Sequence, residues 1–273
     1  MKKVAVILPV YKNDRLEYLQ LAVESIFSQT YKDYHLYIGV DGSIGDDLAE
    51  YLRLLDKQEM VAVIWYKENR GLACVLNDLL AICFEKGYEY IARMDADDIA
   101  LPNRFERQVN YLISHSEVDI VGGAITEIDE EGKNRNKTVV YPETPEACRA
   151  FFSKRNPHAH PAVLFRKRFF DKAGCKYRPE YRQNQDTMLW YDGMMAGTQH
   201  ANISDVVLKF RMTDSLFKKR RNGWAFAKKQ FHDRLMINRG LGYGFMADVY
   251  GFAMFCLLIS PAWVKKVAYR VLR

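Results

Sequence analysis

The chain has 273 residues, of which 49% are hydrophobic and 27% are charged. This composition excludes a mainly disordered protein, and the length allows one large domain or a domain with an appendage. Five scattered cysteines, odd in number and without C-x-x-C spacing, argue against a disulfide framework or a zinc site. The first residues lead directly into an apolar strand, so we expect no secretory leader and a cytoplasmic location.

The net charge of +6 is distributed unevenly along the chain. From residue 206 onward there are 14 Lys and Arg against 3 Asp and Glu, whereas residues 1–205 carry 26 against 31. A basic tail on a mildly acidic body favours an anionic partner for the tail, either a membrane surface or nucleic acid. No recognised nucleic-acid-binding motif accompanies the tail, so we expect no nucleic-acid partner.

Strand-like and helix-like segments alternate through the first half of the chain. In order, the predicted elements are a strand at Val4–Val10, a helix at Leu16–Phe27, a strand at Tyr34–Val40, a helix at Asp46–Leu55, a strand at Val61–Tyr66, a helix at Leu72–Phe84, a strand at Tyr90–Met94 and a helix at Asn103–Ile113. Near-continuous apolar strands separated by helices predict an α/β fold with a mostly parallel sheet covered on both faces.

The pattern changes after Gly122-Gly123. Later predictions are strands at Val118–Val121, Ile125–Ile128, Thr138–Tyr141 and Ala162–Phe165, a helix at Thr187–Met195, and one or two strands within Asn202–Arg211. The strands on either side of residues 130–134 suggest a hairpin. From Asn222 the chain is mostly helical. We therefore predict a domain at residues 1–213, with halves at 1–121 and 122–213, and a helical C-terminal region at 214–273.

The most informative segment is the end of the strand that begins at Tyr90, where Asp95, Asp97 and Asp98 place three carboxylates within four positions. Carboxylates at such short distances repel one another. A divalent cation bridging to a diphosphate is the usual compensation, because Mg²⁺ and Mn²⁺ prefer oxygen ligands. Ligands of open α/β sheets also bind beyond the carboxyl ends of the strands. The alternative is a solvated acidic loop that caps the helix beginning near Pro102.

Three further polar segments follow predicted strands: Pro9-Val-Tyr11, Asp41-Gly-Ser43 and Asn69-Arg70-Gly71. The carboxyl ends of parallel strands open onto one edge, so these segments and the acidic loop converge on one crevice. There Tyr11 can stack on a base, Asp41 can accept hydrogen bonds from a base or ribose, and Arg70 can meet a base carbonyl or a phosphate. Each segment also has an ordinary explanation as a strand stop or a turn.

Five ordered blocks carry a resemblance to a known family. They are Ile7-Leu-Pro-Val-Tyr11, Asp41-Gly-Ser43, Asn69-Arg-Gly-Leu-Ala73, Asp95-Ala-Asp-Asp98 and Pro102-Asn-Arg-Phe-x-x-Gln108. From residue 4 to about 211, the chain resembles family 2 glycosyltransferases with the Rossmann-like GT-A fold. His160-Pro-Ala-Val163 and Gln185-Asp-x-x-Leu-Trp190 resemble blocks of the branch that builds bacterial surface polysaccharides (O-antigen, capsule and exopolysaccharide).

The resemblance implies a metal-dependent, inverting transferase that uses a nucleotide-diphosphate sugar, with Mn²⁺ or Mg²⁺ as the cofactor. Residues 1–121 would bind the nucleotide and residues 122–213 the acceptor. The implied nucleotide-sugar-binding residues are Pro9, Tyr11, Asp41, Arg70, Asp95, Ala96 and Asp97. Of these, Asp97 with Asp95 would hold the cation. Val40 departs from the family, which often has another Asp at this position.

Asp186 falls where the family places its general base, within a Glu-Asp pair. The first member of the pair is Gln185 here, which removes a neighbouring negative charge. Judged from the residues alone, Asp186 can instead be the N-cap of the following helix. His160, Trp190 and Arg211 are further candidate contacts of the diphosphate or acceptor. The ordinary alternatives are a packed loop histidine and a surface arginine.

The C-terminal region combines basic clusters with aromatic and apolar residues. Lys218-Lys-Arg-Arg221 opens it, and Val249–Val264 runs 16 residues without a charge but contains Pro261. A spanning helix needs about 20 apolar residues. We therefore predict an interfacial or shallow re-entrant helix on anionic lipid, peripheral on the inner face of the cytoplasmic membrane. The alternative is a helical pair packed on the domain with solvated lysines.

The combined prediction is transfer of a hexose or N-acetylhexosamine from a UDP-sugar to a saccharide acceptor linked to undecaprenyl diphosphate. Two other classes stay open. A sugar-phosphate nucleotidyltransferase would need a Gly-rich basic loop, which the N-terminal part lacks. A non-catalytic module that binds only nucleotide or lipid would not need the set of Asp95, Asp97 and Asp186.

Overall fold

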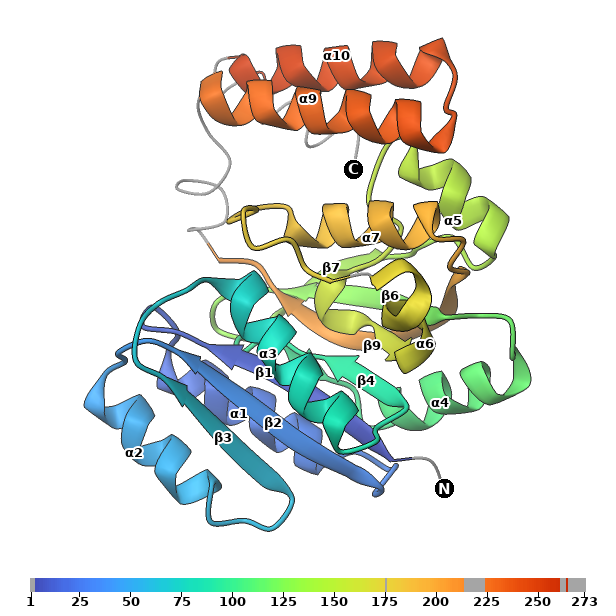
Figure 1. Cartoon of the computed structure of the whole chain (residues 1–273). Helices are drawn as coiled ribbons and strands as arrows, with labels where there is room; N and C mark the ends of the chain where they lie inside the picture. Colours follow the sequence, from blue (N-terminus) through green and yellow to red (C-terminus); the bar gives the residue numbers. More distant parts are fainter. Residues whose placement is uncertain (1–2, 175, 214–223, 261–263, 265–273) are drawn as a thin grey trace.

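The computed structural model describes residues 3–174, 176–213, 224–260 and 264. The strands are β1 (Val4–Val10), β2 (Tyr34–Asp41), β3 (Val61–Tyr66), β4 (Tyr90–Arg93), β5 (Ile99–Ala100), β6 (Ile120–Ile128), β7 (Asn134–Val139), β8 (Leu164–Arg166) and β9 (His200–Arg211). They form one sheet in the order β3-β2-β1-β4-β8-β6-β9-β5, with β7 paired to β6 (Figure 1).

Helices cover this sheet on both faces, as predicted. They are α1 (Leu16–Phe27), α2 (Asp46–Leu55), α3 (Leu72–Glu85), α4 (Arg104–Ser114), α5 (Pro145–Phe152), α6 (Lys167–Asp171), α7 (Gln185–Met195), α9 (Trp224–Leu241) and α10 (Phe245–Ile259). Two short 3₁₀ helices, η1 (His160–Ala162) and η2 (Lys172–Gly174), complete the set. The fold is therefore of the predicted α/β class.

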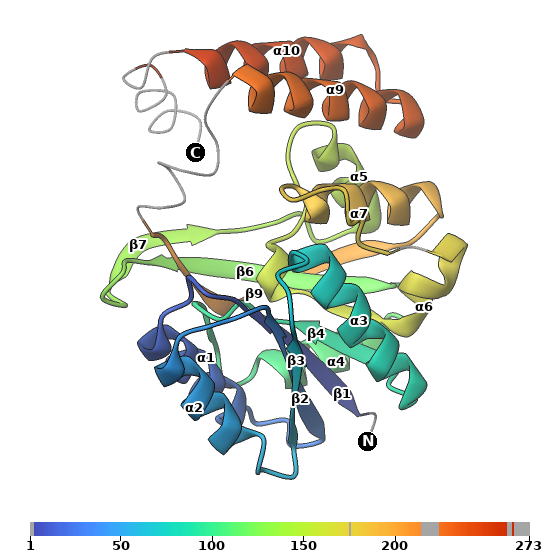
Figure 2. The same ribbon diagram turned by 60° about the vertical axis from the view of Figure 1, so that its left-hand side comes forward.

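The first half of the chain forms the parallel part of the sheet. β1 pairs with β2 and β4, and β2 pairs with β3, all in parallel. Successive residues of β1 point to opposite faces of the sheet. Val4, Val6 and Leu8 pack in the core shared with α1 and α2. Ala5 and Ile7 pack in the core shared with α3 and α7 (Figure 2).

The second half differs from the prediction at a pair of glycines. We predicted separate strands before and after Gly122-Gly123, but β6 runs through them without a break. The reason is close packing with the parallel strand β9. A Cβ atom on Gly122 would collide with the side chain of Asn202, and one on Gly123 would lie 2.8 Å from the methyl groups of Val207. These glycines let two strands approach each other and do not mark a turn.

Other corrections concern the segments between β6 and α7. The predicted hairpin is confirmed, because β6 pairs with β7 in antiparallel orientation. The predicted strand at Ala162–Phe165 instead begins at Leu164, after the 3₁₀ turn η1. The sequence analysis did not predict α5, whose N-cap Thr144 accepts a hydrogen bond from the backbone N–H of Ala147 at 3.3 Å. β8 lies antiparallel between β4 and β6, so this part of the sheet is mixed.

The C-terminal region forms a helical pair on top of α7 and α5. α9 contacts α7, and α10 packs on α9 and lies outermost in both views (Figures 1 and 2). The predicted helical content is confirmed for the described part of this region. Among the helices within the described residues, none has the length and apolar character needed to cross a bilayer. The basic clusters Lys218–Arg221 and Lys265-Lys266 lie outside the described residues.

Candidate active site

The predicted convergence of strand ends is confirmed by the pairing of the sheet. Since β1, β2, β3 and β4 are parallel neighbours, their carboxyl ends share one edge. Pro9 and Tyr11 lie half-buried at the end of β1, and Asp41 closes β2. The acidic loop follows β4 directly. Four polar segments that are far apart in sequence therefore lie along one edge of the sheet.

Asp41 organises the neighbouring turn. Its carboxylate is 5% exposed and accepts hydrogen bonds from the backbone N–H groups of Arg70 at 2.7 Å and Gly71 at 2.9 Å. The side-chain amide of Asn69 donates a third bond at 2.9 Å. Gly71 has φ +92°, a conformation that favours glycine. The predicted contact between Asp41 and a base or ribose stays a prediction. If Asp41 makes this contact, the same carboxylate also holds the Asn69–Gly71 turn beside the ligand.

Arg70 is engaged by the protein. Its guanidinium pairs with Asp78 and lies over the Tyr66 ring, with Cζ 4.6 Å from the ring centroid. Burial, and next the charge of Asp78, raise the pKa of Tyr66 to about 12. A ligand would have to compete with Asp78 for this guanidinium, and the predicted contact of Arg70 with a base or phosphate stays untested.

The three carboxylates of the acidic loop lie together. One oxygen from each of Asp95, Asp97 and Asp98 lies within 4.8 Å of the other two. Ala96, between them, is buried at 4% exposure. The alternative of a helix cap is wrong, because α4 begins at Arg104 and its N-cap is Asn103. The loop is thus a cluster of charges at the sheet edge.

Three buried arginines balance the acidic loop, and each is at most 1% exposed. Arg93 places Nη2 2.5 Å from an Asp95 oxygen. Arg211 donates its backbone N–H to Asp98 at 2.8 Å and its Nε–H to the carbonyl of Asp97 at 2.9 Å. Arg104 donates to the carbonyl of Arg93 at 2.8 Å.

This arrangement shows that the alternative of Arg211 as a surface arginine is wrong. Its Nη1 also donates to the carbonyls of Asp129 at 3.1 Å and Glu130 at 2.9 Å, so it holds the β6–β7 turn near the acidic loop. The predicted phosphate contact of Arg211 is not tested by these bonds. In the family block Pro102–Gln108, the side chain of Gln108 donates to the carbonyl of Ala162 at 2.8 Å. This block connects the acidic loop to β6 and η1.

The balance of charge is incomplete at Asp98. Burial, followed by the charges of Asp97 and Asp95, raises the pKa of Asp98 well above its usual range. Burial and the Asp95 charge raise the pKa of Asp97 to about 6. Among the described residues, Oδ2 of Asp98 is buried and has no hydrogen-bond partner. The loop therefore carries negative charge that its surroundings stabilise only in part.

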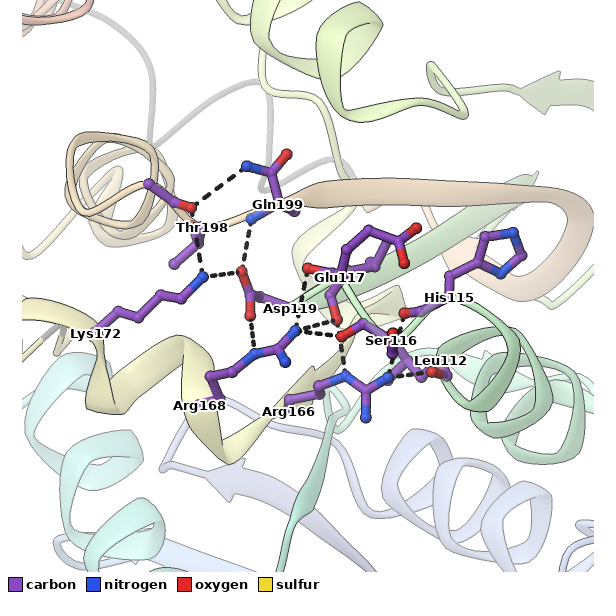
Figure 3. A network of polar contacts seen from close by, with 12 residues as sticks. Leu112, His115, Ser116, Glu117, Asp119, Arg166, Arg168, Lys172, Thr198 and Gln199 are labelled. Carbon is purple, nitrogen blue, oxygen red and sulfur yellow. Dashed lines mark hydrogen bonds and ion pairs between the residues drawn. The ribbon is translucent and has the colours of Figure 1, made fainter.

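A second buried carboxylate, Asp119, shows what full compensation looks like (Figure 3). It accepts a bond from Lys172 at 2.7 Å and one from the backbone N–H of Gln199 at 2.8 Å, and its other oxygen pairs with Arg168. Every oxygen of Asp119 is paired, which is the pattern of a structural carboxylate. The Oδ2 atom of Asp98, without a hydrogen-bond partner among the described residues, is the contrasting case.

Asp186 lies in the first turn of α7. The N-cap of this helix is Asn184, in the left-handed conformation with φ 59°, so the alternative of Asp186 as the N-cap is wrong. Asn156 donates its amide N–H to Oδ2 of Asp186 at 3.1 Å and bonds to the Thr187 hydroxyl at 3.0 Å. The hydroxyl of Thr187 donates in turn to the amide oxygen of Asn156 at 3.1 Å. These bonds fix the carboxylate by neutral groups.

Tyr177 connects the two sides of the site. Burial is the main cause that raises the pKa of its hydroxyl. The charge of Arg93 lowers this pKa, and the smaller effects of the Asp186 and Asp95 charges raise it. The two carboxylate centres are also joined by the segment from Asn156 to Val163, because Asn156 binds Asp186 and the carbonyl of Val163 accepts the backbone N–H of Arg93 at 3.1 Å. The hydroxyl of Tyr177 hydrogen-bonds to Nε2 of His160 at 2.7 Å.

His160 and Trp190 lie beneath this surface. His160 is 8% exposed, and burial holds its pKa well below its usual range, so its ring is neutral. Trp190 is fully buried and its ring centroid lies 5.9 Å from those of His160 and Phe165. The geometry assigns both residues to packing under the site. A direct contact of either residue with a ligand stays a prediction.

Comparison with known proteins decides the family. Residues 5–174 match the profile described as Glycosyl transferase family 2. The chain is 33% identical over 226 residues to the amylovoran biosynthesis glycosyltransferase AmsE of Erwinia amylovora, a match that covers 83% of this chain and 82% of that protein. The chain belongs to glycosyl transferase family 2.

Other relatives support the same assignment. This family 2 glycosyltransferase is 26% identical over 234 residues to the Escherichia coli UDP-Gal:alpha-D-GlcNAc-diphosphoundecaprenol beta-1,3-galactosyltransferase, covering 84% of this chain and 82% of that one. Its fold matches S. aureus TarS 1-349 in complex with UDP-GlcNAc, with a TM-score of 0.66, 13% identity, and coverage of 92% and 69% of the two chains. It spans 43% of a longer TarS chain. The predicted family and GT-A fold are confirmed.

The acidic loop of this glycosyltransferase fits a divalent cation. It offers hard oxygen ligands within 4.8 Å of one another, and Asp98 contributes a buried oxygen that the described protein leaves unpaired. Asp95 and Asp97 were the predicted ligands, and the structure adds Asp98 as a third candidate. Both lines of reasoning therefore point to the same loop.

Four residues that shape the site were missed by the sequence analysis: Arg93, Arg104, Asn156 and Tyr177. A charged residue inside the apolar strand that ends in the acidic loop was an available signal for Arg93. Asn156 lies 30 residues from Asp186, and Tyr177 lies 17 residues from His160. No local pattern marks such pairs.

Proposed function

We propose that this family 2 glycosyltransferase moves a hexose or N-acetylhexosamine from a UDP-sugar to a saccharide acceptor with inversion at the anomeric carbon. The acceptor is a saccharide carried on undecaprenyl diphosphate, in the synthesis of a cell-surface polysaccharide. The names of the relatives in amylovoran and diphosphoundecaprenol chemistry support this choice. The observation that carries the proposal is the cluster of three carboxylates at the sheet edge, with Asp186 joined to the strand before it through the segment from Asn156 to Val163.

The chemistry follows from these two carboxylate centres. Asp186 takes the proton of the attacking acceptor hydroxyl, whose oxygen forms a bond to the anomeric carbon as the bond to the UDP oxygen breaks. The side-chain amide of Asn156 donates to Oδ2 of Asp186 and so holds this carboxylate in one orientation. Asp41 keeps the Asn69–Gly71 turn closed beside the nucleotide. One in-line displacement of this kind inverts the anomeric centre.

Asp95, Asp97 and Asp98 would hold Mn²⁺ or Mg²⁺. When bound, the cation supplies Lewis-acid stabilisation of the charge that develops on the departing diphosphate. The buried arginines hold the loop in place, since Arg93 pairs with the carboxylate of Asp95, and Arg211 binds the carboxylate of Asp98 and the backbone carbonyl of Asp97. The loop therefore needs no rearrangement to present its oxygens.

The test replaces Asp186 by Asn. We expect kcat to fall by about 10²–10⁴-fold, the usual contribution of a general base. The Kd for UDP in the presence of Mn²⁺, measured by calorimetry, should stay unchanged. Transfer at the wild-type rate would remove Asp186 from this role, and lost UDP binding would show a folding defect instead. A panel of nucleotide sugars, ranked by metal-dependent thermal stabilisation, identifies the donor.

We also infer that the protein lies peripherally on the inner face of the cytoplasmic membrane through its C-terminal helices. Phe245, Val249, Phe252 and Ile259 follow helical spacing on α10 and are exposed by 77%, 42%, 55% and 41%. An outer helix face without charge, next to exposed Trp224, fits the lipid interface.

The test is flotation with vesicles. Binding to vesicles that contain phosphatidylglycerol should exceed binding to pure phosphatidylcholine, and Phe252→Glu should abolish it. Leu54→Glu is the control, because Leu54 is equally exposed at 56% but lies on α2. Equal flotation of both variants would rule out α10 as the contact surface.

A further inference from the structure

The arginines around the site differ in what they bind. Arg93, Arg104 and Arg211 are buried and bonded to the acidic loop or its neighbours. Arg70 pairs with Asp78. The fifth, Arg182, lies exposed in the loop between η2 and α7, four positions before Asp186. Within the residues that the structure describes, it forms no hydrogen bond or ion pair.

Arg182 nevertheless lies at a defined place. Its guanidinium rests on Gly71, since a Cβ atom built on that glycine would be 3.0 Å from Cζ of Arg182. Gly71 is the N-cap of α3 and belongs to the turn that Asp41 closes. The loop that precedes the proposed base therefore reaches across the crevice to the nucleotide side, with a cation at the point of contact.

The position of this cation lacks an internal explanation. The N-terminus of α3 carries the positive end of the helix dipole, where arginine is unfavourable and an anion is favourable. The carboxylate of Asp41, which binds the turn, already accepts three hydrogen bonds. An anionic group between α3 and Arg182 would be attracted by both. The planar guanidinium matches the oxygens of a phosphate in a two-point contact.

We propose that Arg182 binds a phosphate of the diphosphate group that the site accepts. This diphosphate belongs either to the donor nucleotide or to the lipid-linked acceptor. Both of these ligands are taken from the proposed function, on which this proposal rests. Arg182 then takes the role that the sequence analysis gave to Arg70. Through this contact the loop 176–184, which precedes Asp186, takes part in binding the ligand.

The experiment compares Arg182→Ala with Arg53→Ala. Arg53 is the matched control, because it is an arginine of α2 that lies over the ring of Trp65. Kd values are measured at saturating Mn²⁺ for UDP and uridine, and for farnesyl diphosphate and farnesol. If the donor phosphate is bound, the Kd for UDP rises about tenfold, the size expected for one charge-assisted hydrogen bond, and that for uridine stays constant. If the acceptor phosphate is bound, the Kd for farnesyl diphosphate rises and that for farnesol does not.

Arg182→Lys, which keeps the charge but loses the planar fork, should recover part of the affinity. Unchanged affinity for both diphosphates in Arg182→Ala overturns the proposal. An equal loss for uridine and UDP also overturns it, because the effect would then be on the pocket as a whole. These binding measurements are independent of turnover, so a wild-type protein that transfers no sugar would refute the proposed function without affecting this result.

Discussion

The acidic loop and the Asp186 segment are two carboxylate centres built in different ways. The acidic loop follows one strand and is held by buried charges, with Arg93 2.5 Å from Asp95 and Arg211 bonded to Asp98. Asp186 is held by a neutral amide, Asn156, from a distant loop. The first centre stores electrostatic energy in a fixed place. The second accepts a hydrogen bond that crosses between two segments of the chain.

The difference fits the tasks that we propose for the two centres. A cation and a departing diphosphate need a fixed set of charges, because preorganised charge costs no reorganisation during the reaction. A base that meets different acceptor hydroxyls needs ionisation near neutral pH and some freedom of position. A variant that removes the Arg93 charge from the acidic loop should therefore lower stability, whereas a variant that removes the Asn156 amide from Asp186 should lower kcat.

The largest effect is expected at Arg93. Arg93→Met leaves the Asp95 carboxylate beside two other acids, and loss of one partner of a buried pair costs about 3–5 kcal/mol. The free energy of unfolding in urea, measured without metal, checks this value. Arg70→Met is the matched control, because its pair with Asp78 is exposed and worth about 0–1 kcal/mol. Equal costs for the two variants would contradict the charge-balanced picture of the acidic loop.

A chain of buried histidines beside the Asp186 side gives the next effect. Nδ1 of His158 donates to Oδ1 of Asn202 at 2.8 Å, because the amide N–H groups of Asn202 are used by the carbonyls of Pro142 and Pro157. Nε2 of His158 then accepts from Nδ1 of His200 at 3.0 Å. Both rings must be neutral in this chain. Burial, the main cause, lowers the pKa of His158 to about 4.

The sign of the pH effect follows from this lowered value. Between pH 6.5 and about 4, His158 binds a proton in the unfolded chain but stays neutral in the folded protein. The free energy of unfolding therefore falls as the pH falls. Each such histidine contributes about 1.4 kcal/mol per pH unit. Unfolding curves from pH 7 to 4.5 should show His158→Gln with a shallower decline than wild type. His232→Gln, at an 80% exposed position, should follow wild type. Parallel declines of wild type and His158→Gln would disprove the assignment.

The acidic loop responds to pH with the opposite sign. Because burial and Asp95 raise the pKa of Asp97 to about 6, the folded metal-free protein keeps a proton there that the unfolded chain has released above pH 3.8. Acid therefore favours the folded loop, and this contribution is lost as the pH rises through 6.

A cation must displace that proton. We expect the affinity for Mn²⁺ to fall by at least about tenfold per pH unit below 6, because protons on Asp97 and on Asp98, whose pKa is also raised, must leave before the cation binds. Electron paramagnetic resonance of free Mn²⁺ measures the affinity without UDP, whose own phosphate titrates in this range. Asp97→Asn should bind Mn²⁺ weakly at every pH. A wild-type affinity that does not change from pH 5 to 7 would rule out Asp97 as a ligand.

The two centres also differ in how far the sequence alone could predict them. The apolar strands and the polar residues after them predicted the sheet edge with Asp41 and Asp95, because the pattern is local. The Gly122-Gly123 pair was misread, since a glycine that admits a neighbouring strand looks the same in sequence as a glycine that turns the chain. Arg93 was missed although its place in an apolar strand was a signal, because the sequence does not show which carboxylate balances a buried charge. The contact between Asn156 and Asp186 depends on how two loops fold together.

The smallest effect separates the amide support from the charge support. Asn156→Ala removes a donor that stabilises the ionised carboxylate of Asp186. We expect kcat to fall about tenfold, since the base stays present but loses one hydrogen bond and its fixed orientation. The acidic limb of the pH–rate profile should move to higher pH, and the KM for the donor should not change. Asn156→Asp should shift the limb further by placing a second carboxylate beside the first. A fall in kcat without any shift of the limb would mean that Asn156 serves only the packing of the loop, and the carboxylate would then be held by other contacts.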